Sequence, residues 1–368
     1  MHRLLVVIAT AILTLAACAP APQPAAQPSG QPVTDWDRLV EAAKREGTVS
    51  VIGPTGDDRR TVLTEPFEKK YGITVEFLGD NGPGVPPRIS SERGAGLYLW
   101  DLFVGGTTTC LESLAPMGVL HPLEPVLLLP EVTDPASWRG GQLEFVDDAR
   151  SILAMTPFQR GTLFINPNLV RADEIKSYRD LLDPKWKGKL VIDDPRKAGA
   201  GQATFTFFYR HPELGADFIR ALARQEPLIL RDYLQQLDGV GQGRYPLVIG
   251  SSDAIAEQRI KSGVPIAIVD PRQIKEGSDV SPASGALTLF NNQPHPNAAR
   301  LYVNWLLSKE GQTAFAQGTG YISSRVDVPT DHTFPWRVPM PGAVKTYDQE
   351  AMVVKDEVLP FVTEIFGR

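Results

Sequence analysis

The chain has 368 residues, and its 43 acidic side chains outnumber its 37 lysines and arginines, which gives a formal net charge of -6. Charges of both signs are mixed along the chain without a basic block, which excludes nucleic acid as the expected partner. Beyond the first residues, no apolar run is long enough to span a bilayer.

The first 17 residues have the layout of a secretory signal peptide. His2 and Arg3 precede an apolar run, Leu4–Leu15, that is too short to cross a hydrocarbon layer of roughly 30 Å. Small residues then lead to Cys18, an arrangement that resembles the bacterial lipobox, in which this cysteine becomes lipid-modified. We expect residues 1–17 to be removed and Cys18 to anchor the chain. An ordinary cleaved signal is the alternative.

Residues 18–33 comprise the anchoring cysteine and a tether. Alanine, proline, glutamine, serine and glycine make up almost all of the tether, so it lacks the apolar periodicity that a folded core requires. Its proline content favours an extended spacer that holds a domain away from a membrane. The expected location is the periplasm or the outer face of the cell membrane, and the folded body begins near Thr34.

The first part of the body alternates helices and strands, which is typical of a parallel sheet covered by helices. Thr34 or Asp35 begins a helix that ends before Gly47. The next expected elements are a strand over 49–52, a helix over 57–70, strands over 73–78 and 99–104, and a helix over 110–117.

Three of these strands end in loops that are rich in glycine, threonine, serine or asparagine. In open parallel sheets such loops line the ligand crevice, because the carboxyl ends of the strands meet at one edge. Thr55, Asn81 and Thr107 are therefore candidate ligand contacts. The alternative is that these residues only form turns and helix caps.

A second alternating section follows a predicted strand pair over 151–156 and 162–166. Its expected elements are strands over 190–192, 247–249 and 266–269, and helices over 201–210 and 253–262. After it come a strand over 286–290 and helices over 297–307 and 310–317.

The body is too long for one ordinary core, so two lobes are expected. The order of the elements favours one lobe inserted into the other. We assign 34–160 and 285–368 to lobe 1 and 161–284 to lobe 2. The crossings between the lobes are expected near 159–166 and 270–285.

Three segments in the correct order resemble the extracellular solute-binding proteins of ABC importers. They are the helix and strand after Asp35, the stretch Asp180–Lys189, which reads DLLDPKWKGK, and the stretch His295–Gln312. The similarity is to the branch that contains ferric-iron, thiamine, polyamine and phosphonate binders. It implies an α/β, two-lobed periplasmic-binding-protein fold of type II, with mainly parallel sheets flanked by helices and a two-crossing hinge.

The resemblance also implies a monomeric binding protein, without catalysis or a cofactor, that delivers a small-molecule solute to an ABC permease in the membrane. Signalling to a membrane sensor is an alternative. An extracytoplasmic enzyme on the same scaffold is less well supported, because the chain has no G-x-S-x-G motif, no Cys–His partnership and no histidine spacing of a metal site.

Iron is not the expected solute. The iron binders of this branch hold the metal with adjacent tyrosines after the strand that corresponds to 247–249. The chain has Gly250–Ala254 at that place, which reads GSSDA and contains no tyrosine. Because phenolate ligands make such a site selective for ferric iron, no metal site is expected here.

The resemblance places an anion site at the start of the helix expected over 201–210. Iron binders of this branch carry an anion there on backbone N–H groups, and a helix N-terminus favours negative charge. We therefore expect a small anion, such as a carboxylate, phosphonate or phosphate ester, and a cation of the thiamine or polyamine kind is the alternative. The further candidate ligand contacts are Arg160, Arg196, Ala200, Gly201, Gln202, Ser251, Ser252 and Tyr321.

Overall fold

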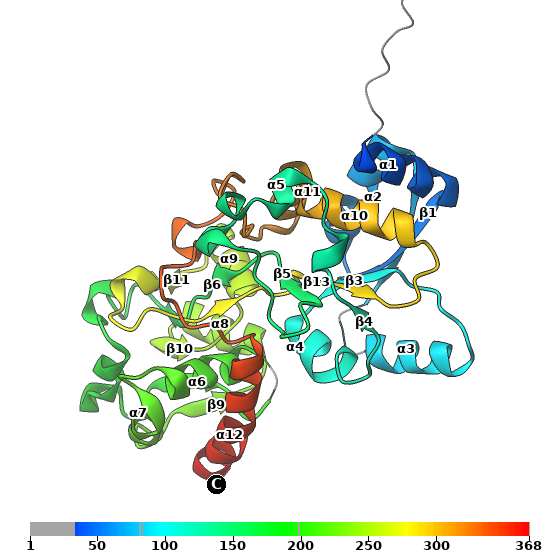
Figure 1. Ribbon diagram of the computed structural model, residues 1–368. Coiled ribbons are helices and arrows are strands. Elements are labelled where there is room, and N and C mark those ends of the chain that lie inside the picture. The colour runs from blue at the N-terminus through cyan, green and yellow to red at the C-terminus, as the bar shows by residue number, and fades with distance from the viewer. Residues whose placement is uncertain (1–33, 81, 83, 198, 368) are drawn as a thin grey trace, which may run out of the picture.

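The computed structural model describes residues 34–80, 82, 84–197 and 199–367. The predicted signal peptide, Cys18 and the tether lie outside the described residues, and so does Asn81. The described chain forms two large sheets flanked by helices, together with a two-stranded sheet (Figure 1). The predicted two-lobed α/β fold is confirmed.

The first lobe is built on a six-stranded mixed sheet. Its strands are β1 (Thr48–Gly53), β2 (Thr74–Gly79), β3 (Leu102–Gly105), β4 (Leu120–His121), β5 (Ile152–Ala154) and β13 (Ala286–Phe290). The order is β2-β1-β3-β13-β4, and β5 also pairs with β13. β1 runs parallel to β2 and β3, whereas β13 runs antiparallel to its partners.

Helices cover the sheet of the first lobe, with α1 packed against α10 and α2 against α11. Their bounds are α1 (Asp35–Glu46), α2 (Asp57–Tyr71), α3 (Val85–Gly94), α4 (Thr107–Thr109), α5 (Pro130–Thr133), α10 (Pro296–Leu307) and α11 (Lys309–Thr319). A π-helical turn, Cys110–Leu114, continues α4 directly. The helix predicted over 110–117 therefore begins earlier, at the end of the loop after β3.

Local sequence accounts for both ends of α1. Thr34 Oγ1 accepts a hydrogen bond from the N–H of Asp37 at 3.1 Å, and an Asp37 carboxylate oxygen accepts one from the N–H of Thr34 at 3.0 Å. Gly47 ends the helix in the left-handed region, with φ of 73°. Leu39 and Ala43 are buried against the core, as their spacing predicts.

The second lobe is built on a five-stranded mixed sheet in the order β11-β7-β10-β8-β9. Its strands are β7 (Leu163–Ile165), β8 (Leu190–Asp193), β9 (Leu228–Leu230), β10 (Leu247–Ile249) and β11 (Ala267–Ile268). The helices around it are α6 (Ala200–Arg210), α7 (Gly215–Ala223), α8 (Tyr233–Gly241), α9 (Asp253–Lys261) and α12 (Gln349–Phe366). β8 runs parallel to β9 and β10, and β7 runs antiparallel to β10 and β11.

Two short strands, β6 (Phe158–Gln159) and β12 (Val280–Ser281), form an antiparallel pair where the chain passes between the lobes. The strands predicted over 151–156 and 162–166 do not pair with each other. β5 joins β13 in the first sheet, and β7 joins β10 and β11 in the second. The segment between β5 and β7 is therefore a crossing and not a hairpin turn.

A third crossing lies near the C-terminus, in contrast to the two-crossing hinge and to the assignment of 285–368 to lobe 1. Lys345 forms a parallel bridge with Val280 of β12, which places the chain beside the hinge strands. The following helix, α12, packs along α6 of the second lobe (Figure 1). Val358 and Val362 are buried in the core of that lobe, because the apolar side of α12 fits its surface.

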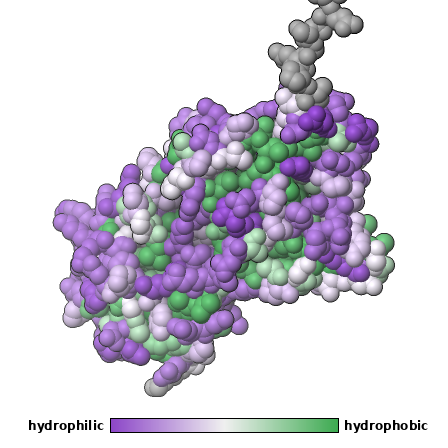
Figure 2. Space-filling view, viewed as in Figure 1, coloured by the Kyte–Doolittle hydropathy of each residue, from purple (hydrophilic) through white to green (hydrophobic). Residues whose placement is uncertain are grey.

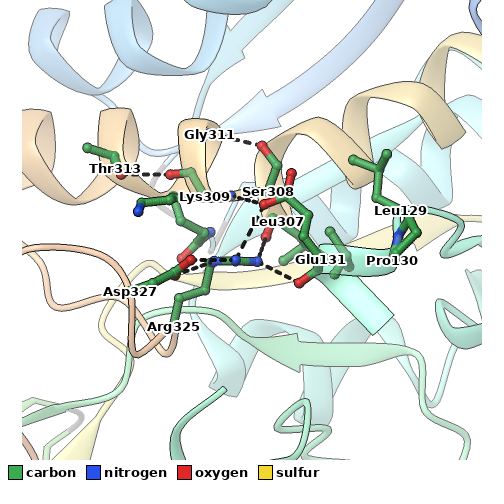
Figure 3. Close-up of polar contacts among 12 residues, drawn as sticks. Leu129, Pro130, Glu131, Leu307, Ser308, Lys309, Gly311, Thr313, Arg325 and Asp327 are labelled. Atoms are coloured by element: carbon green, nitrogen blue, oxygen red, sulfur yellow. Dashed lines mark hydrogen bonds and ion pairs between the residues drawn. The ribbon is translucent and has the colours of Figure 1, made fainter. Parts of the chain in front are cut away.

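Arg325 fixes the chain that follows α11. Its side chain is buried and donates two hydrogen bonds to Asp327, of 2.8 and 2.9 Å (Figure 3). It also donates to the carbonyl oxygens of Glu131 in α5 and of Leu307 at the end of α10. This arrangement satisfies a buried guanidinium and holds residues 325–327 against α5 and the end of α10.

Within the described ranges, no helix combines the length and the apolar character that crossing a membrane requires. Hydrophilic residues dominate the face drawn in Figure 2, and apolar residues appear in patches between them. Leu97, Tyr98 and Leu99, which follow α3, are among the exposed apolar residues.

We predict that Phe366→Ala lowers the free energy of unfolding by about 3 kcal/mol, because its ring is buried in the second lobe. The ring packs edge-on against Phe205 of α6, with centroids 5.4 Å apart. Urea denaturation measures the change. Val353→Ala on the same helix, where the valine is 61% exposed, is the control and should change the stability by less than about 0.5 kcal/mol. Equal effects of the two substitutions would contradict this packing.

Candidate ligand cleft

A cavity of about 600 Å³ lies between the lobes and is lined by residues from both. The predicted contacts that line it are Thr107, Arg160, Ala200, Gln202, Ser251, Ser252 and Tyr321. Thr55, Arg196 and Gly201 are described by the structure but are not among the lining residues. Asn81 lies outside the described residues. The crevice at the ends of the strands is therefore present, but its composition differs from the prediction.

Groups of the protein itself occupy the start of α6. The N–H of Gly201 donates to a carboxylate oxygen of Asp193 at 2.7 Å. The N–H of Ala200 donates to the hydroxyl of Tyr233 at 3.0 Å. Gln236 donates to the other oxygen of Asp193 at 2.8 Å and fixes the carboxylate against the helix. Asp193 thus takes the position that the sequence assigned to an external anion, which corrects the prediction for Gly201.

Arg196 is engaged away from the cavity. Its guanidinium makes hydrogen bonds of 2.7 and 3.0 Å to the two carboxylate oxygens of Asp194, and it donates to the carbonyl oxygen of Phe366 at 2.8 Å. Burial opposes ionisation of Asp194, but the hydrogen bonds from Arg196 and Arg231 lower the pKa of its carboxyl to about 2. Arg196 therefore binds a carboxylate of the protein and the end of α12, which corrects its predicted role.

Arg160 lines the cavity from the hinge and is held in a buried ion pair. Its Nη1 lies 3.2 Å from a carboxylate oxygen of Asp279, and its Nη2 donates to the carbonyl oxygen of Ala200 at 3.4 Å. Burial works against the charged form, but the carboxylates of Asp279 and Asp253 together raise the pKa of Arg160. Arg160 thus places a guanidinium in the cavity wall whose charge Asp279 balances.

Basic side chains outnumber acidic ones in the described lining of the cavity. The basic residues that the sequence did not single out are Arg59, Lys261, Arg337 and Lys355. Together with Arg160 they face two carboxylates, Asp253 and Glu257. Arg337 pairs with Glu257 in the lining, and Arg160 and Lys355 pair with Asp279 and Glu112 outside it. Arg59 and Lys261 remain against the single carboxylate of Asp253. The lining has an excess of positive charge.

Among the missed basic residues, Arg59 carried a signal in the sequence. Arg59 lies in the first turn of α2, directly after the loop that ends β1, so the rule that selected Thr55 could have included it. Arg337 and Lys355 come from the chain after α11, which reaches the cavity only because it crosses back to the second lobe. No pattern in the local sequence predicts that crossing.

Aromatic rings form part of the wall beside the hinge. Tyr321 stacks on Phe158 of β6 with ring centroids 5.9 Å apart and an angle of 18° between the planes. The guanidinium of Arg337 lies 4.8 Å from the centroid of Phe158, within the range of a cation–π interaction. This wall combines a flat apolar surface with a positive charge.

Asp253 is buried at the start of α9 and faces the cavity. The N–H of Gly161 donates to its carboxylate at 2.9 Å. Burial raises the pKa of the Asp253 carboxyl to about 6, although Arg337 and Arg160 act in the opposite direction. Among the residues that the structure describes, no three histidine, cysteine, aspartate or glutamate side chains are grouped to hold a metal ion.

Residues 62–340 match the family model described as bacterial extracellular solute-binding protein. The chain belongs to this family. This solute-binding protein is also 23% identical over 268 residues to an uncharacterized protein of Haemophilus influenzae, a match that covers 69% of this chain and 71% of the relative. Membership makes the protein a solute-binding component of ABC transport that acts outside the cytoplasm, not an enzyme.

Solved structures show the same fold at low identity. A Trichodesmium protein, IdiA (FutA), in complex with iron and citrate has a TM-score of 0.67 at 17% identity, covering 86% of this solute-binding protein and 99% of its own chain. The periplasmic binding protein AfuA of Actinobacillus pleuropneumoniae, with exogenous fructose-6-phosphate bound, has a TM-score of 0.58 at 18% identity, covering 87% and 98%.

We predict that Asp253→Asn changes how the stability of the protein depends on pH. Because the pKa of Asp253 lies above its ordinary value of 3.8, the folded state binds the proton more tightly than the unfolded state. Ionisation of this carboxyl should therefore remove on the order of 3 kcal/mol as the pH rises from about 4 to 7. Urea denaturation at a series of pH values should show this loss in the wild type relative to the variant. If the stabilities of the wild type and the variant changed equally with pH, this prediction would be contradicted.

Proposed function

We propose that the protein captures a small organic anion, such as a phosphate ester or a carboxylate, and delivers it to an ABC permease. The observation that carries this proposal is the excess of basic over acidic side chains in the described lining of the cavity. In a partly desolvated cleft, unbalanced positive charge favours an anionic partner. A thiamine-like or polyamine-like cation would instead need an acidic majority.

Arg59 is the strongest candidate for direct contact with the anion. It lines the cavity from the first lobe, and its Nη1 donates to the carbonyl oxygen of Thr55 at 3.2 Å. Its Nε is buried and has no hydrogen-bond partner among the described residues. A buried donor of this kind supports a bound oxyanion, because an unsatisfied charged N–H is costly.

Hydroxyl groups from both lobes add neutral donors. Thr107 and Thr108 line the cavity at the start of α4, and Ser252 lines it from the loop before α9. The hydroxyl of the neighbouring Ser251 already donates to Gln236 at 2.7 Å. Because donors lie on both lobes, one solute can contact both lobes at once. A solute that binds the closed form more tightly than the open form drives closure. A cavity of about 600 Å³ is of the size that small-molecule ligands occupy.

The tyrosines at this cavity do not favour ferric iron as the solute. Burial raises the pKa of Tyr233, whose hydroxyl accepts a hydrogen bond from Ala200. Burial and Glu144 raise the pKa of Tyr347, whose hydroxyl lies 2.5 Å from a carboxylate oxygen of Glu144. Both hydroxyls are thus engaged by groups of the protein, which supports a solute other than ferric iron. The iron found with related structures is therefore not carried over to this chain.

The test of the proposed function is a thermal-shift screen of phosphate esters, carboxylates, thiamine and spermidine. An oxyanion at 100 times its dissociation constant should add about 2.7 kcal/mol to the stability. Arg59→Gln should weaken oxyanion binding about tenfold or more, because a hydrogen bond to a charged group contributes about 1.5–3 kcal/mol. Arg60→Gln is the matched control, since Arg60 is the exposed neighbour and is not among the lining residues. Stabilisation by thiamine or spermidine, with none by any oxyanion, would overturn the proposal.

We also propose that Cys18 carries a lipid and that residues 18–33 tether the body to the outer face of the membrane. The support is the lipobox-like sequence and the proline-rich composition that follows it. Cys18→Ser should release the protein from the membrane fraction, and the mass of the wild-type N-terminal peptide should include acyl chains. A wild-type peptide without acyl chains would contradict the anchor.

A further inference from the structure

The C-terminal helix α12 is anchored on the second lobe. Val358, Val362 and Phe366 are buried among residues of α6, α7 and the sheet of that lobe. Arg210 of α6 also donates to the carbonyl oxygen of Lys345, just before the helix, and lies 3.5 Å from Asp348 at its start. When the second lobe moves, α12 therefore moves with it.

The first half of α12 forms part of the cavity wall. Ala351, Met352 and Lys355 are lining residues, and they lie on one side of the helix because Lys355 follows the other two by four and three residues. The side chain of Lys355 is 18% exposed. An ammonium group from the second lobe is thus present in the space that the solute enters.

Lys355 binds an acidic residue of the first lobe. Its Nζ lies 2.6 Å from a carboxylate oxygen of Glu112, whose side chain is 40% exposed. Glu112 belongs to the π-helical turn after α4, where Cys110 and Leu114 are buried in the core of the first lobe. The ion pair therefore joins the two lobes at the cavity, a short distance along the chain from Thr107.

We propose that Lys355 is a solute-binding residue that exchanges Glu112 for the anionic group of the solute. The inference rests on the proposed anionic solute. In the absence of solute, Glu112 neutralises Lys355 and joins α12 to the first lobe. A phosphate or carboxylate group in the cavity then pairs with Lys355 in place of Glu112. The carboxylate of Glu112 is solvated by water instead. Occupancy of the cavity and the contact between the lobes are then coupled through one ammonium group.

The chemistry of the pair suits such an exchange. An ion pair with a partly exposed carboxylate contributes little net stability, so Glu112 is a weak competitor. Lys355 is mostly buried, so it requires a negative partner in either state, and the solute supplies one. Another cation at this cavity, Arg337, is held by Glu257 through two nitrogens and is less easily released.

Titration calorimetry with fructose-6-phosphate and inorganic phosphate tests this proposal on four proteins. They are the wild type, Glu112→Gln, Lys355→Met and the double variant. Glu112→Gln should bind the better of the two anions at least threefold more tightly, because the competitor is gone. Lys355→Met should bind it at least tenfold more weakly. In the double variant the gain from Glu112→Gln should disappear, because competition requires Lys355.

Glu310→Gln is the matched control. Glu310 pairs with Lys70 on the first lobe, outside the cavity lining, so its loss removes one negative charge without freeing Lys355. Equal affinity of the wild type and Glu112→Gln would overturn the exchange while leaving the anion-binding function standing. The same holds for a gain that persists without Lys355, because it would reflect long-range charge alone. Failure of both anions to bind the wild type would overturn this inference and the proposed anionic solute together.

Discussion

One buried ion pair, between Arg160 and Asp279, joins all three segments that cross between the lobes. Arg160 follows β6, Asp279 precedes β12, and Thr346 on the third crossing donates to the same carboxylate oxygen of Asp279 at 3.0 Å. Removing one member of a buried pair leaves an uncompensated charge, at a cost of about 3–5 kcal/mol. If the ion pair stays intact when the lobes move, the lobes must rotate about these three segments. The cavity lies directly beside them.

Groups of the protein itself engage the start of α6, so the positive charge of the cleft must come from other residues. Asp193 accepts from the N–H of Gly201 and the Tyr233 hydroxyl accepts from that of Ala200. Asp194 binds Arg196, so these two amides and this arginine are already engaged within the protein. The positive charge that faces the cavity comes instead from side chains such as Arg59 and Lys355, which lie on different lobes. An anion bound between them would draw the lobes together.

The third crossing gives the C-terminal chain two roles. It adds a helix to the core of the second lobe and brings Tyr347, Met352 and Lys355 to the cavity. Its apolar residues repeat along the sequence, as at Val358 and Val362, so a helix could have been predicted there. The lobe on which that helix packs could not, since an apolar helix face specifies burial but not a partner.

The sequence by itself determined several elements of both lobes, because caps such as Thr34, stops such as Gly47 and apolar periodicity act over a few residues. It gave no element for α3, α7, β9, α8 or α12. It also identified the strand-end loops that carry Thr107, Ser251 and Ser252 into the cleft, since parallel strands end at one edge. Only the tertiary structure decided which charges meet there. The pairing of Arg196 with the protein's own carboxylate, and the arrival of Lys355 from the C-terminus, depend on contacts between segments far apart in the chain.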